Sequence, residues 1–189
     1  MTKSKIQDFK AGAIVEIRFS DREKVFGRLL PGVASALAVY DLVVDQGKNC
    51  EVSELKKAPV LFYCGLYRDL VIKGVFPIVD FWDFTLMEIH KLPYIFFLQD
   101  KVNIDDCIVF GAGKEERKVT PEECIGLERS SVWDEQGILK RISDHYSGRR
   151  NPLVELDKVI LSKNDPRYLP PPGALRWDFE KQEYYRTDK

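Results

Sequence analysis

Histidine and cysteine, the side chains that most often bind metals or act as nucleophiles, are few and far apart in this chain of 189 residues. The two histidines are His90 and His145, and no H-x-H or H-E-x-x-H pattern is present. No two cysteines have the C-x-x-C spacing that is common in zinc sites; the four are Cys50, Cys64, Cys107 and Cys124. We therefore predict no metal, no cofactor and no catalytic residue, and expect reduced cysteines that are buried or half-buried.

The densest group of reactive residue types lies in residues 120–151, and helix-capping signals explain most of it. Thr120 is a favoured N-cap, and Glu123, three residues later, completes a capping box. Asp134 can cap a second helix, with apolar residues at helical spacing behind it and Gly148 as its stop. The pattern predicts two short helices joined at a tight corner.

Three other residues of this stretch could take part in chemistry. Cys124 and His145 could form a nucleophile and base pair, but only their nearness in sequence suggests it. The simpler interpretation of His145 is a last-turn histidine that interacts favourably with the helix dipole. For Glu128 it is a salt bridge or a cap to a neighbouring loop.

The N-terminal part of the chain has the pattern of an antiparallel meander. Residues 13–20 alternate between apolar and charged side chains, and residues 25–30 and 34–45 are two further apolar runs. Asp41 is unusual, because it falls on the apolar face of the third run. We expect it to pair with an arginine such as Arg28 or to accept backbone N–H bonds at a bulge, since an unpaired carboxylate is costly there. A ligand-binding or catalytic role for Asp41 is the alternative.

These patterns together predict an α+β fold. Residues 1–162 would form one domain, with a bent antiparallel sheet and a C-terminal helical hairpin packed on it. An SH3-like barrel at the N-terminal end is an open alternative. Residues 163–189 would be a polar, proline-containing tail.

Composition and charge exclude several classes of partner. The formal net charge is −1, so no overall field attracts the chain to nucleic acid or to an anionic membrane. No apolar run approaches the roughly 20 residues that a membrane span needs, and the N-terminus has no signal-peptide pattern. We expect a cytoplasmic protein with no membrane partner, and nucleic-acid binding is disfavoured.

One segment combines acidic and aromatic residues. Residues 75–113 contain six carboxylates, two lysines and eight of the 22 aromatic side chains. Aromatic residues anchor interfaces and charge steers encounter, so this segment could contact a basic partner. We predict Asp80, Trp82 and Asp83 as the partner-binding residues. The alternative is that the aromatics are core residues and the acids are merely solvated.

Several sequence blocks match one family in order. They include Ile-Val-Glu-Ile-Arg-Phe and Val-Phe-Gly-Arg-Leu-Leu near the N-terminus, Ala-Val-Tyr-Asp-Leu, Pro-Val-Leu-Phe at 59–62 and Leu-Gln-Asp at 98–100. The most specific block runs from Glu122 through Val-Trp-Asp at 132–134 to His-Tyr-Ser-Gly and Asn151. Over roughly residues 11–158 the chain resembles the immunity protein 26 family, a family also labelled phosphotriesterase HocA. The residues that match as structural or candidate functional positions are Asp41, Gln99, Asp100, Glu123, Glu128, Trp133 and His145.

The resemblance implies an immunity protein of a bacterial polymorphic or contact-dependent toxin system. Such a protein binds and neutralises a cognate protein toxin, and it is not an enzyme. The second family label implies the alternative, a hydrolase that acts on phosphotriesters. That reaction commonly uses metal ions held by histidines and carboxylates. A site made of both histidines with Asp41, Asp100 or Glu128 is conceivable, but no spacing in the sequence supports it.

Overall fold

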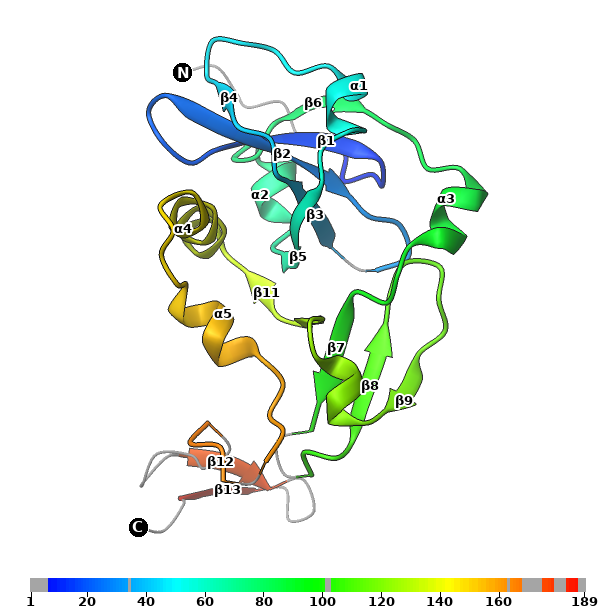
Figure 1. Cartoon of the computed structure of the whole chain (residues 1–189), viewed down its shortest axis with the longest axis vertical. Coiled ribbons are helices and arrows are strands. Elements are labelled where there is room, and N and C mark those ends of the chain that lie inside the picture. The colour runs from blue at the N-terminus through cyan, green and yellow to red at the C-terminus, as the bar shows by residue number, and fades with distance from the viewer. Residues whose placement is uncertain are drawn as a thin grey trace.

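The computed structural model describes residues 7–33, 35–100, 103–162, 164–167, 175–178 and 183–186. The predicted α+β class is confirmed. The described residues form a large mixed sheet, a smaller four-stranded sheet and a separate two-stranded hairpin. In Figure 1 the large sheet lies at the top, the small sheet below it and the hairpin at the bottom.

The large sheet contains the predicted N-terminal meander. Its strand order is β11-β5-β3-β2-β1-β6, and β4 pairs with β2. All of its pairings are antiparallel except the one between β11 and β5. The strands are β1 (Ala13–Arg18), β2 (Glu23–Leu29), β3 (Ala36–Tyr40), β4 (Val44–Asp45), β5 (Val60–Leu66), β6 (Ile78–Phe81) and β11 (Val132–Trp133).

The small sheet has the order β10-β7-β8-β9, and β10 runs parallel to β7. Only two residues, Ser130 and Ser131, lie between β10 and β11, so this short stretch links the two sheets. The strands of the small sheet are β7 (Phe96–Gln99), β8 (Cys107–Phe110), β9 (Arg117–Val119) and β10 (Glu128–Arg129). The hairpin consists of β12 (Leu175–Asp178) and β13 (Glu183–Arg186).

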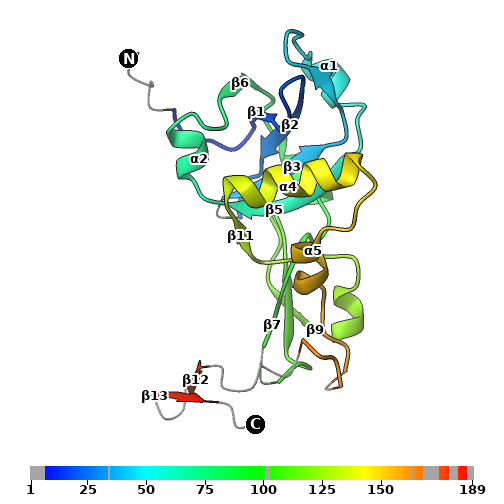
Figure 2. The ribbon, with the colours of Figure 1, turned by 90° about the vertical axis from the view of Figure 1, so that its left-hand side faces the viewer.

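Short helices surround the sheets, and one longer helix covers the large sheet. In Figure 2, α4 crosses in front of the large sheet and α5 lies at the junction between the sheets. The helices are α1 (Val52–Leu55), α2 (Asp69–Ile72), α3 (Leu86–Lys91), the 3₁₀ turn η1 (Pro121–Cys124), α4 (Glu135–Tyr146) and α5 (Pro152–Asp157). None of the helices in the described ranges is long and apolar enough to span a membrane.

Both faces of the large sheet are buried. Ile138 and Ile142 of α4 pack on one face against side chains such as Val15. On the opposite face, Leu55 of α1 joins a second cluster with Phe26. Because β1 is covered on both sides, five of its six residues are buried even though its sequence alternates between apolar and charged.

The sheets do not close into a barrel, so the SH3-like alternative is wrong. The predicted helical hairpin is also wrong in its first half. The capping box of Thr120 and Glu123 opens only a single 3₁₀ turn. After it, the backbone pairs with two strands distant in sequence, as shown by the hydrogen bond from Glu128 N to the Ile95 oxygen at 2.9 Å. The second helix is confirmed as α4, capped by Asp134.

The prediction for Asp41 is wrong as well. The ladder register shifts between Val39 and Tyr40, and Asp41 lies just beyond the end of β3 as an exposed residue. Its carboxylate accepts a hydrogen bond from the Tyr146 hydroxyl of α4 at 2.9 Å. Arg28 instead donates from Nε to the Trp82 oxygen at 2.9 Å. Asp41 is therefore not a buried carboxylate.

Candidate functional site

Gln99 of β7 joins the small sheet to the segment that follows α5. Its Nε2 donates to the Ile104 oxygen at 2.9 Å and to the Ile160 oxygen at 2.7 Å. Its Oε1 accepts from Ile160 N at 2.9 Å and from Arg129 Nη2 at 3.2 Å. The buried amide thus satisfies both of its polar atoms within the fold, as buried polar groups generally must. Gln99 therefore holds the segment after α5 against the small sheet.

Glu128 and Trp133 connect the junction to α4 and α5. Glu128 of β10 accepts two hydrogen bonds from Arg141 of α4, at 2.6 and 3.0 Å, which confirms the expected salt bridge. Trp133 donates from Nε1 to Ser131 Oγ at 3.1 Å, and Ser131 donates to Asp157 Oδ2 at 2.7 Å. These contacts tie four elements together where the two sheets meet.

The remaining family-matching residues are exposed. Glu123 completes the η1 capping box and pairs with Arg117 at 3.1 Å; the backbone N–H of Thr120 lowers the pKa of its carboxyl. Asp100 accepts from Asn103 N at 2.6 Å in the loop after β7. His145 lies in the last turn of α4, as expected, with its ring edge-on to Tyr146.

The structure does not bring the candidate catalytic residues together. Cys124 of η1 is buried in a cluster with Cys107 of β8, whereas His145 of α4 lines a different hollow together with Leu61 and Phe62 of β5. Burial raises the pKa of the Cys124 thiol to about 12, which disfavours the thiolate. His90, the other histidine, belongs to α3, which is well separated from α4 in Figure 1. No group of three metal-ligating side chains occurs among the described residues.

The predicted partner-binding residues lie at one edge of the large sheet. Asp80 belongs to β6, which in the described part of the chain pairs only with β1. Asp80 and Asp83 are both exposed, and Trp82 between them is half-buried. The segment 79–87 also exposes large apolar side chains, namely Val79, Phe81, Leu86 and Met87. We call residues 79–87 the edge segment.

Arg28 holds the middle of the edge segment against the sheet. Its guanidinium carbon lies 3.6 Å from the Trp82 ring centroid and 3.4 Å from that of Phe84. Trp82 also stacks on Tyr40 of β3. Burial lowers the pKa of Arg28, although Tyr40 and two acidic side chains partly oppose this shift. By packing on Arg28 and Tyr40, Trp82 fixes the position of the exposed residues on either side of it.

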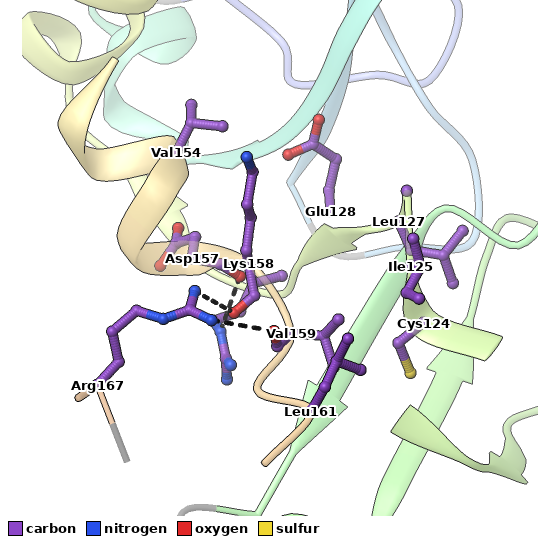
Figure 3. Close-up of a pocket in the computed structure, with 12 residues that line it drawn as sticks. Cys124, Ile125, Leu127, Glu128, Val154, Asp157, Lys158, Val159, Leu161 and Arg167 are labelled. Atoms are coloured by element: carbon purple, nitrogen blue, oxygen red, sulfur yellow. Dashed lines mark hydrogen bonds between the residues drawn. The ribbon is translucent and has the colours of Figure 1, made fainter. Parts of the chain in front are cut away.

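A cavity of about 510 Å³ lies between η1 and β10 on one side and α5, residues 158–161 and Arg167 on the other. Figure 3 shows its lining, with Ile125, Leu127 and Leu161 around the space and Val154 on α5. We call it the junction cavity. This cavity was not predicted from the sequence, because its walls meet only where β10 pairs with β7 and where Gln99 of β7 hydrogen-bonds to Ile160 after α5.

The chain is an α+β protein with two open sheets, and a short stretch of residues links one sheet to the other. The family model described as Immunity protein 26 matches residues 10–108, which is just over half of the chain. The chain therefore belongs to the immunity protein 26 family, as the sequence resemblance indicated. The match ends before residues 122–151, the block in which the sequence resemblance is most specific. Comparison with curated proteins gave no match, and neither did comparison with solved structures.

Proposed function

We propose that this immunity protein binds a cognate protein toxin and neutralises it stoichiometrically, with the edge segment as the contact surface. The observation that carries the proposal is the set of exposed acidic and apolar side chains on a sheet edge that has no further strand partner among the described residues. This segment also lies inside the range that matches the family.

The composition of the edge segment fits a protein partner. Leu86 and Met87 are 77% and 66% exposed, so burying them against a partner would remove apolar surface from water. Asp80 and Asp83 would steer a basic surface into place, which raises the association rate more than the final affinity. Pairing of β6 with an incoming strand is restricted, because Ile78 N already donates to Gln7 Oε1 at 2.6 Å and Phe81 N to Asp80 Oδ1 at 2.7 Å.

Charge reversal tests this surface without disturbing the core. Asp80→Lys with Asp83→Lys should weaken binding to the cognate toxin domain and should reduce the protection of cells that produce the toxin. The matched control is Glu115→Lys with Glu116→Lys, two exposed acids in the turn between β8 and β9. Both double variants change the net charge by the same amount, so a difference in binding between them depends on where the charges are reversed.

Affinity is measured by calorimetry and protection by survival of toxin-expressing cells. If the Asp80 and Asp83 variant retains wild-type affinity and protection, the contact surface lies elsewhere. If wild-type protein does not bind that toxin at all, the proposed function itself is wrong.

A further inference from the structure

The junction cavity has the size and the lining of a small-molecule site. Its volume of about 510 Å³ falls within the range of roughly 300–1,000 Å³ that ligand pockets usually have. Most of its lining surface is apolar, and Ile125 and Leu161 keep 60% and 49% of their surface exposed. An apolar molecule that entered the cavity would cover both side chains.

Charged side chains also line the cavity, and most of them are already paired. Glu128 pairs with Arg141, Lys158 with Glu155 and Arg167 with Asp165. These residues therefore have little unbalanced charge to offer a ligand.

Arg129 is different, because its hydrogen bonds go to neutral acceptors. Its Nε donates to the Asp157 backbone oxygen at 3.1 Å and its Nη2 to Gln99 Oε1 at 3.2 Å. Within the described part of the chain it has no ion pair, and its Nη1 has no acceptor. The carboxylate of Asp157, which also lines the cavity, instead accepts from Ser131 at 2.7 Å.

The surroundings of Arg129 favour an added negative charge. The guanidinium is half-buried over the Phe97 ring, and burial together with the nearby cation Arg167 lowers its pKa, with Asp157 opposing. A carboxylate in the cavity would neutralise a cation that is short of water and could form a two-pronged hydrogen bond with it.

We propose that the junction cavity binds a small amphipathic carboxylate, whose carboxyl group pairs with Arg129 and whose aliphatic body lies against Ile125, Leu127, Val154 and Leu161. The ligand class is that of a medium-chain fatty acid. This site is distinct from the edge segment, and it does not depend on the proposed toxin binding.

Decanoate, used below its micellar concentration, is the probe for this site. Titration calorimetry of the full chain should show saturable binding of one decanoate per chain. Decanol, which has the same aliphatic body without the charge, should bind at least about tenfold more weakly, a difference of about 1.4 kcal/mol. Absence of saturable decanoate binding would overturn the proposal, and equal binding of decanol would remove the role assigned to Arg129.

Two variants with equally exposed side chains localise the ligand. Ile125→Glu places a negative charge at the cavity, whereas Leu156→Glu places it on α5 outside the cavity; the native side chains are 60% and 61% exposed. We expect Ile125→Glu to weaken decanoate binding about tenfold and Leu156→Glu to change it less than about twofold. Equal effects of the two variants would show that decanoate binds elsewhere.

A second pair of variants tests the cation. Arg129→Lys should retain most of the preference for decanoate over decanol, and Arg129→Met should abolish that preference. Because both variants lose the hydrogen bond geometry of the guanidinium, circular dichroism and thermal unfolding must first show that each one is folded. A preference that survives in Arg129→Met would refute the assignment.

Discussion

Replacement of Lys24 by methionine should destabilise the protein strongly, because it leaves a buried carboxylate without its closest partner. Lys24 Nζ lies 2.7 Å from Glu16 Oε2, and the two side chains are only 5% and 8% exposed. Removing one member of a buried ion pair usually costs about 3–5 kcal/mol. Arg18, 63% exposed, still pairs with Glu16 at 2.7 Å, so we expect a loss near the lower end, about 3 kcal/mol.

Urea unfolding followed by tryptophan fluorescence measures this loss, since the chain contains three tryptophans. A loss of that size is a large part of the roughly 5–15 kcal/mol that stabilises a typical domain. The double variant Glu16→Met with Lys24→Met removes both charges, and we expect it to lie within about 1 kcal/mol of wild type or to be more stable. If Lys24→Met alone stays within about 0.5 kcal/mol of wild type, the reasoning fails.

The effect should also depend on pH in a defined direction. Burial by itself would raise the pKa of Glu16, but hydrogen bonds from Lys24 and Arg18 outweigh burial and lower it. A carboxyl whose pKa is lower in the folded state adds stability above its unfolded pKa, about 4.3, and loses it as the pH falls through the folded pKa. The difference between wild type and Lys24→Met should therefore be full at pH 7 and should shrink below about pH 4.

The remaining predictions concern the thiols and the histidine of α4. At pH 8, iodoacetamide should label the half-buried Cys50 first and Cys124 only after unfolding, because Cys124 is fully buried and its pKa is raised to about 12. Peptide mass spectrometry shows the order in which the two cysteines are labelled. Labelling of Cys124 in the folded protein would contradict its burial. His145→Ala should leave toxin protection unchanged, because His145 lies near Leu61 and Phe62 of β5, and three strands separate β5 from β6 and its edge segment. Purified protein with added metal should hydrolyse a chromogenic phosphotriester no faster than the metal blank; turnover that His145→Ala abolishes would favour the hydrolase instead.

Local signals were sufficient for many of the elements. The alternation in residues 13–20 and the apolar run at 25–30 predicted β1 and β2, and their antiparallel pairing is confirmed. Asp134 and Gly148 bound α4 as expected, since Asp134 accepts from Gly137 N at 2.7 Å and Gly148 has a φ of 64°. Caps and alternation depend on residues within a few positions of one another, so they can be recognised in the sequence alone.

Contacts between distant residues decided the rest. The sequence predicted a tight corner between two helices before Asp134. Instead, Glu128 pairs with Phe96 and Val132 with Gly65, so this stretch forms β10 and β11, each of which runs parallel to a strand of a different sheet. That pairing also placed one wall of the junction cavity and gave Glu128 its partner Arg141 on α4.

Asp80, Trp82 and Asp83 illustrate what the sequence determines and what depends on the tertiary structure. The sequence alone determined the family resemblance, the α+β class and an acidic, aromatic segment around these residues. Only the tertiary structure decided that the acids are exposed at a sheet edge while Trp82 packs on Arg28. The physical reason is that burial depends on which distant strand covers a residue, and neither composition nor spacing within a segment contains that information.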